Sequence, residues 1–166
     1  MIDTSIITLD KQSLIILSFI EVDSSKNLEK LKRLLNGLNS MCPEMIIICG
    51  RIFTEHVSET ESTAKFRNYL ESLGQIIKDD SLINLRDHTE WVFVPSLEDP
   101  GQIKTLPCYS LSESMFNGFV GPQIFKIKKV TFANNPCRIS FLGKEIVICR
   151  YNFMTRIKQN HHPKII

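Results

Sequence analysis

The chain has 166 residues, which is enough for one ordinary globular domain. Hydrophobic residues make up 43% of the sequence and charged residues 23%, a balance that excludes intrinsic disorder and predicts a substantial core. The 20 basic and 18 acidic side chains give a net charge of only +2, so the chain as a whole lacks the excess positive charge of a strong nucleic-acid binder.

The cysteines and the apolar runs favour a soluble protein inside the cell. Five cysteines are scattered without a CxxC pair, which indicates reduced thiols rather than a disulfide framework. Cys49 and Cys149 each end an apolar run, and we expect both to be small core residues. No signal peptide is visible, and the longest apolar runs, such as residues 45–49, are far shorter than the roughly 20 residues of a membrane span.

The first part of the chain has the pattern strand, helix, strand. Residues 14–20 (LIILSFI) predict a strand that is buried on both faces. Capping residues and then leucines at helical spacing predict a helix that weakens at Gly37 and Asn39 and stops at Pro43. Residues 45–49 (MIIIC) predict a second buried strand, which gives a βαβ unit with a right-handed crossover.

The middle of the chain predicts another helix and another strand. Residues 58–61 have the spacing of a capping box, and an apolar stripe that runs to Ile77 predicts the helix. Residues 91–94 (WVFV) predict a third buried strand. The Pro- and Gly-containing residues 95–107 predict a loop, and residues 112–116 predict a short helix.

The last third of the chain no longer alternates strands with helices and has the pattern of antiparallel β structure. Residues 127–131 alternate loosely between polar and apolar side chains. Residues 137–141 and 145–149 flank a turn sequence at 142–144, which predicts a β-hairpin. The predicted fold class is therefore α/β, with α+β character at the C-terminal end.

The residues after each apolar run are the candidate site, because ligand sites of open α/β sheets lie at the carboxyl ends of the strands. Glu21 and Asp23 follow the first run, Arg51 follows the second, and residues 96–99 (SLED) follow the third. This layout resembles the calcineurin-like metallophosphoesterases. That family carries D-x-H, G-D and G-N-H-[DE] at these places, where carboxylates and histidines hold two divalent metals that activate water against a phosphate ester.

The chain departs from this metal-binding pattern at each strand end. Phe19 and Glu21 stand in place of the first Asp and His, Arg51 in place of the bridging Asp, and Leu97 and Glu98 in place of the Asn and His. An aromatic ring is no metal ligand, and a guanidinium opposes metal ions. The resemblance therefore implies an inactivated site, and we expect no catalytic, cofactor-binding or metal-binding residue, no cofactor and no enzymatic activity.

Four further segments stand out along the chain: ICG at 48–50, VFVP at 92–95 running into EDPG at 98–101, NNPCRI at 134–139 and KEIV at 144–147. In their order and spacing, from about Ser13 to Arg156, the chain resembles the B subunits of eukaryotic replicative DNA polymerases, which carry inactivated phosphoesterase domains of this kind. Among these subunits it is most similar to the epsilon type.

The resemblance implies a partial calcineurin-like fold in a single domain, residues 1–166, that corresponds to the N-terminal portion of the family's phosphoesterase domain. We expect the family's OB-type domain and C-terminal β-rich half to be absent. The implied function is that of a non-catalytic accessory subunit in the nucleus, which supports DNA replication by binding the C-terminal region of the catalytic subunit of DNA polymerase epsilon. Other holoenzyme subunits are implied partners, contact with DNA is expected to be weak or indirect, and no contact with a membrane is expected.

Two other functions stay open: an active metal-dependent phosphoesterase or exonuclease, and an unrelated α/β binding module. Basic residues thicken toward the C-terminus, where we expect mainly solvated faces and, as the alternative, a patch for the DNA backbone. They are Lys126, Lys128, Lys129, Arg150, Arg156, Lys158 and Lys164.

Four further patterns are interpreted as structural rather than as a catalytic dyad, an acid/base pair, a metal site or a base-stacking platform. They are Asp87-His88-x-Glu90 as a solvated loop, Glu98-Asp99 as a turn, His161-His162 as a polar tail, and Trp91 with Phe93 as core.

Overall fold

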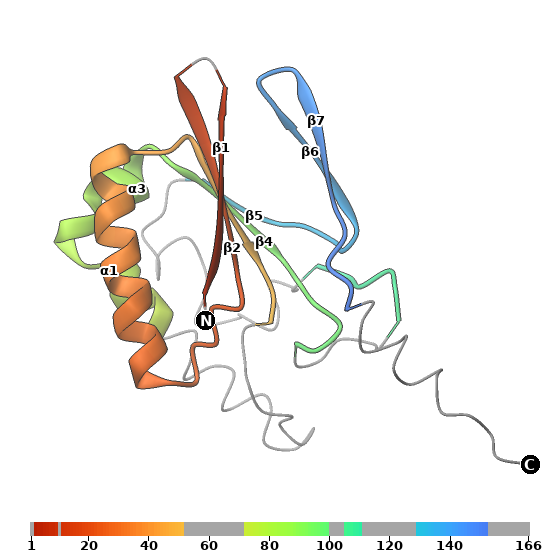
Figure 1. The fold of residues 1–166 in the computed structure, drawn as a ribbon, viewed down its shortest axis with the longest axis horizontal. Coiled ribbons are helices and arrows are strands. Elements are labelled where there is room, and N and C mark those ends of the chain that lie inside the picture. Colours follow the sequence, from red (N-terminus) through yellow and green to blue (C-terminus); the bar gives the residue numbers. More distant parts are fainter. Residues whose placement is uncertain (1, 10, 52–71, 100–104, 111–128, 153–166) are drawn as a thin grey trace, which may run out of the picture.

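The computed structural model describes residues 2–9, 11–51, 72–99, 105–110 and 129–152. Its strands are β1 (Asp3–Leu9), β2 (Gln12–Ser18), β3 (Met45–Cys49), β4 (Glu90–Val94), β5 (Lys129–Phe132), β6 (Cys137–Phe141) and β7 (Lys144–Ile148). The first five form one sheet in the order β1-β2-β3-β4-β5 (Figure 1). β1 pairs with β2 antiparallel, whereas β2, β3, β4 and β5 are parallel.

A long helix, α1 (Ser25–Met41), connects β2 to the parallel strand β3, so the predicted βαβ unit is confirmed. Leu31, Leu35 and Leu38 are buried at helical spacing and face the sheet. The apolar stripe of the sequence thus becomes the face on which the helix packs.

The end of α1 agrees with the prediction that Pro43 stops this helix. Gly37 and Asn39 are inside the helix, and Cys42 ends it in the left-handed region (φ 48°) with its N–H donating to the Leu38 carbonyl at 2.9 Å. Asn39 stays helical because its Oδ1 accepts a hydrogen bond from the Leu85 N–H at 3.2 Å. A tertiary contact here outweighs the low helix propensity of asparagine.

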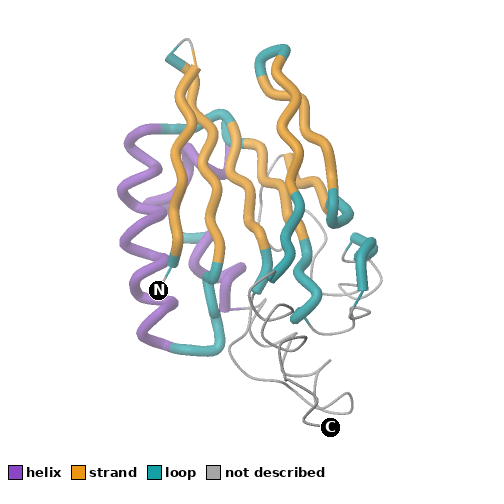
Figure 2. Tube along the Cα trace, turned by 45° about the vertical axis from the view of Figure 1, so that its right-hand side comes forward, coloured by secondary structure: helices purple, strands orange, loops and turns teal. Residues whose placement is uncertain are grey.

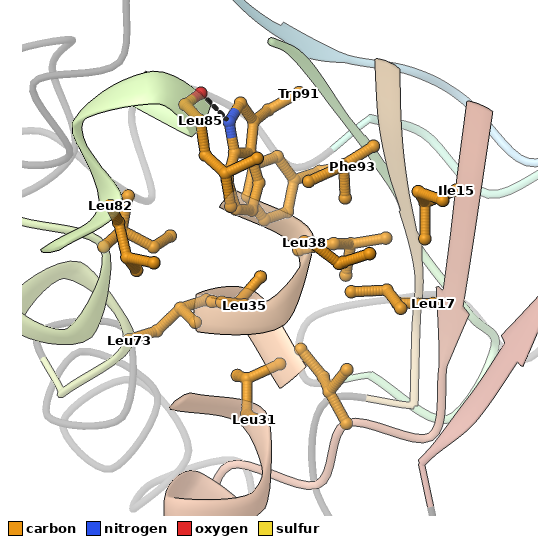
Figure 3. Packing of buried hydrophobic residues seen from close by; sticks show 14 of the residues in the cluster. Ile15, Leu17, Leu31, Leu35, Leu38, Leu73, Leu82, Leu85, Trp91 and Phe93 are labelled. Carbon is orange, nitrogen blue, oxygen red and sulfur yellow. Dashed lines mark hydrogen bonds between the residues drawn. The ribbon is translucent and has the colours of Figure 1, made fainter. Parts of the chain in front are cut away.

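The helices lie together on one face of the five-stranded sheet (Figure 2). Besides α1 they include helical residues 72–77, the short 3₁₀ helix η1 (Asp80–Leu82) and α3 (Ile83–Asp87). Trp91 and Phe93 of β4 point into the cluster between the sheet and these helices, and the Trp91 Nε1–H donates to the Leu85 carbonyl at 3.0 Å (Figure 3). The interpretation of both aromatics as core residues is confirmed.

The opposite face of the sheet is covered by the hairpin of β6 and β7, which forms a separate two-stranded sheet. The sequence predicted this hairpin, and its turn uses Leu142 and Gly143 at positive φ (50° and 71°). Phe141 is buried among Leu14, Met45, Ile47 and other residues of a second apolar cluster between hairpin and sheet. The α/β fold with an antiparallel end is therefore confirmed.

Three features differ from the prediction or were not predicted. β1 is an additional edge strand, and its alternation of polar and apolar residues is too weak in the sequence to have indicated it. β5 joins the sheet as a fourth parallel strand. Cys149 is exposed rather than buried, because it follows β7 on the outward side of the hairpin, whereas Cys49 is buried as expected.

Several predictions lie outside the described residues. They concern the first part of the second helix (58–71), the short helix at 112–116, His161-His162, and the basic residues Lys126, Lys128, Arg156, Lys158 and Lys164. Within the part of the chain that the structure describes, no helix is long and apolar enough to cross a membrane.

Candidate functional site

The carboxyl ends of β2, β3 and β4 lie at one edge of the sheet. Ser18 pairs with Cys49, and Cys49 pairs with Val94, so the three strands end at the same level. The turns that follow them are therefore neighbours, as the sequence predicted from the general placement of sites in α/β sheets.

Three charged side chains meet at this edge, one from each turn. Arg51 Nε lies 3.7 Å from Glu21 Oε1 and 3.8 Å from Glu98 Oε2. The side chain of Glu21 is 15% exposed, and those of Arg51 and Glu98 are about one-third exposed (33% and 34%). Because the three side chains are partly buried, solvent screens their charges less than those of fully exposed ion pairs.

The turn after β2 has an uncommon backbone. Phe19 and Glu21 both adopt positive φ (55° and 43°), a backbone conformation that residues other than glycine rarely adopt. The Asn27 side chain donates to the Glu21 carbonyl at 3.3 Å and to Glu21 Oε2 at 3.4 Å, which ties this turn to the first turn of α1. Backbone of this kind persists where surrounding contacts hold it, and it directs Glu21 toward Arg51.

Gly50 is required by close packing between the ends of β3 and β4. Its N–H donates to the Val94 carbonyl at 2.8 Å. A Cβ atom at Gly50 would lie 2.0 Å from Asp99 Oδ2 and 2.6 Å from the Ser96 nitrogen, which no real Cβ contact permits. Asp99 Oδ2 in turn accepts a hydrogen bond from the Ser96 N–H at 2.8 Å, so the Asp99 carboxylate closes the turn after β4.

Glu98 and Asp99 therefore have different structural roles. Asp99 is buried and caps its own turn, whereas Glu98 reaches Arg51. These contacts agree with the interpretation of the pair as a turn.

Arg150 is a site residue that the sequence did not reveal, because its pattern indicated a solvated face. Its guanidinium carbon lies 4.1 Å from the centroid of the Phe19 ring, and its Nε donates to the Gly50 carbonyl at 3.4 Å. A cation above an aromatic ring is attracted by the ring's negative face. Arg150 thus fastens the segment after the hairpin to the edge of the parallel sheet.

The backbone of Arg150 is held by Asn135, whose side chain is fully buried. Asn135 Oδ1 accepts from the Arg150 N–H at 2.8 Å, and Asn135 Nδ2 donates to the Arg150 carbonyl at 2.8 Å. The main chain of Asn135 pairs with Cys108 through two further hydrogen bonds of 2.7 and 3.0 Å. The NNPCRI segment that carries the family resemblance therefore includes the residue that joins three separate parts of the chain.

A shallow hollow of about 250 Å³, part of it open to solvent, lies beside the cluster and is lined by Ser96, Leu97, Glu98, Arg150 and Asn152. Leu97 and Glu98, two of the candidate site positions in the sequence, are thus next to one another on its wall. Within the described ranges, no three His, Cys, Asp or Glu side chains are grouped so that they could hold a metal ion.

Among the described residues, the remaining titratable candidates are Cys49, Asp87 and His88, and they form no nucleophile or acid/base pair at this edge. Burial raises the pKa of the Cys49 thiol to about 11, although Arg150 nearby lowers it in part. His88 is exposed and Asp87 ends α3, so the solvated-loop interpretation holds for His88 but not for Asp87. Both precede β4, whose first residue, Glu90, pairs with Met45 at the amino end of β3 and thus at the opposite edge of the sheet.

Comparison with known proteins identifies the family. The model that describes the B subunits of DNA polymerases alpha and epsilon matches residues 14–165. The chain belongs to this family.

Similar relatives include DNA polymerase epsilon subunit 2 of Drosophila melanogaster, which is 29% identical over 154 residues, 92% of this chain and 27% of the relative. The human protein of the same name is 30% identical over 146 residues, 88% of this chain and 26% of the relative. The probable DNA polymerase epsilon subunit 2 of Caenorhabditis elegans is 30% identical over 148 residues, 87% of this chain and 26% of the relative.

The predicted resemblance to B subunits of the epsilon type is therefore confirmed. The chain spans about a quarter of the length of the curated relatives named here first. β1 precedes the segment that the family model matches.

Proposed function

We propose that the chain is part of a non-catalytic accessory subunit of DNA polymerase epsilon. It would support nuclear DNA replication by binding the C-terminal region of the catalytic subunit and by contacting other subunits of the holoenzyme. The observation that carries this proposal is the family match over residues 14–165, together with relatives that are named as epsilon subunits.

The charged cluster at the strand ends supports a non-catalytic role. Arg51 places a permanent positive charge between Glu21 and Glu98, at the position where the calcineurin-like pattern has a metal-bridging carboxylate. Two cations close together repel each other, so a guanidinium at this position opposes the binding of divalent metal ions. The residues that the structure describes at this edge therefore do not fit a dinuclear metal centre.

We propose weak or indirect contact with DNA because of the charge of the chain. The net charge of the chain is +2. Arg150, one of the C-terminal basic residues, is engaged by Phe19 and by the Gly50 carbonyl rather than displayed on an open surface. Backbone binding to DNA requires several exposed cations that neutralise phosphates together. The exposed cations Lys26, Lys30 and Arg33 lie on α1 rather than in the turns at the strand ends, so they do not add to a basic surface there.

Co-purification tests the proposed partner. The chain is co-expressed with the catalytic subunit of DNA polymerase epsilon and, as a matched control, with that subunit lacking its C-terminal region. We expect recovery of the chain in stoichiometric amounts with the full catalytic subunit and loss of recovery with the shortened one. Equal recovery with both, or with neither, would contradict the proposed binding to the C-terminal region of the catalytic subunit.

A further inference from the structure

One positive charge joins the turns after β2, β3 and β4. Arg51 follows the central of the three strands, and its Nε is 3.7 Å from the carboxylate of Glu21 on one side and 3.8 Å from that of Glu98 on the other. These three residues are defined here as the strand-end cluster. The cluster connects turns that belong to different crossovers of the fold.

The two carboxylates need a cation between them. Both are within reach of the same nitrogen, and Glu21 is largely buried, so their mutual repulsion is screened less than at an open surface. The Asn27 Nδ2 also donates to Glu21 Oε2 at 3.4 Å. Rotation of the Glu21 side chain into solvent would break this hydrogen bond.

We infer that Arg51 is the resident cation of this edge and takes over the structural role that a bound divalent metal ion has where such strand ends carry a metal site. A guanidinium attached to the chain cannot dissociate, so the positions of the three turns do not depend on metal supply. Removal of Arg51 would leave a latent cation site, because hard divalent ions bind carboxylate oxygens. The inference concerns the chain alone and does not depend on the proposed polymerase partner.

The test uses the 166-residue chain and the variant Arg51→Gln, which keeps polar hydrogen bonding but removes the charge. Thermal unfolding is followed in buffer with a chelator and again with about 1 mM MnCl₂ or CaCl₂, a concentration that a weak carboxylate site requires. We expect R51Q to unfold about 2 to 6 °C below the wild type without metal and to regain a clear part of this loss with metal. The wild type should show no response to either ion.

Two control variants separate a specific site from general ion effects. Arg51→Lys keeps the positive charge, so its melting temperature should not respond to metal. The triple variant E21Q/R51Q/E98Q lacks both carboxylates and should likewise not respond. A metal response of the wild type or of the triple variant as large as that of R51Q would overturn the inference.

A further measurement keeps the inference testable if R51Q does not fold. In the wild-type background, Glu21→Gln and Glu98→Gln leave Arg51 in place and remove one partner each. We expect each to lower the melting temperature by about 1 to 4 °C at low salt and by less at about 1 M NaCl, where ion pairs are screened. Unchanged melting temperatures in both variants would show that the cluster does not stabilise the fold and would overturn the inference.

Discussion

Asn135 joins segments that lie far apart along the chain, at 108, 135 and 150. Both functional groups of its buried amide bond to the backbone of Arg150, and its main chain bonds to Cys108. Buried backbone groups that lose such partners suffer a desolvation penalty. The Asn135 side chain therefore helps to hold the segment after the hairpin, together with the contacts of Arg150 to Phe19 and Gly50.

Replacement of Asn135 by alanine should be costly. It leaves the N–H and the carbonyl of Arg150 without their partners, so we expect a loss of about 2 to 3 kcal/mol in the free energy of unfolding. Urea denaturation checks this value. The neighbouring Asn134 is a matched control, since its exposed side chain accepts one hydrogen bond from the Ser110 N–H at 2.8 Å, and N134A should cost under about 1 kcal/mol. Equal losses for the two variants would contradict the role assigned to Asn135.

Cys49 and Cys149 should differ sharply in reactivity. The raised pKa of Cys49, about 11 against an ordinary 9.0, makes its thiolate roughly 100-fold rarer near pH 8, and its burial hinders access further. Cys149 is exposed. In native protein treated with iodoacetamide and analysed by peptide mass spectrometry, Cys149 should be labelled first. The rate at Cys49 should rise about tenfold per pH unit up to its pKa, since the thiolate is the reactive form. Similar rates at the two sites near pH 8 would refute this picture.

At the scale of elements, α1 ends in a conformation that suits glycine better than the residue present. Cys42 has φ 48°, and left-handed backbone costs a residue with a Cβ about 1 kcal/mol or more. Cys42→Gly should therefore raise the free energy of unfolding by about 0.5 to 1 kcal/mol, as measured by urea denaturation. Gly37 lies inside the same helix, so G37A offers a comparison with a different cause: it should stabilise through helix propensity alone. A loss of stability in C42G would show that contacts of the half-buried thiol outweigh the backbone gain.

Some of these helices and strands could be predicted from local patterns in the sequence, and others could not. β2, α1 and β3 follow from continuous apolar runs and from leucines at helical spacing, because burial on both faces or on one stripe leaves those patterns. The hairpin follows from two short apolar segments around a glycine-containing turn. β1 left no comparable signal, since an edge strand is mostly exposed and pairs on one side only.

At the scale of the whole molecule, the topology alone predicted the edge at which the candidate site lies. Parallel strands bring their carboxyl ends together, and Glu21, Arg51 and Glu98 could therefore be named from the sequence. Arg150 could not be named from the sequence, because it lies 100 residues from Gly50 along the chain. It reaches the site only because the hairpin packs on the sheet. Contacts between separate layers depend on packing, and no local pattern encodes them.

We infer that the described strand ends carry a charge cluster rather than a metal centre. Calorimetric titration of the wild-type chain with MnCl₂, followed by a phosphodiesterase assay on the same samples, tests this inference most directly. We expect no saturable heat of binding and no turnover, because the Arg51 guanidinium lies close to both Glu21 and Glu98. Tight binding of two metal ions per chain, or hydrolysis that depends on them, would contradict it.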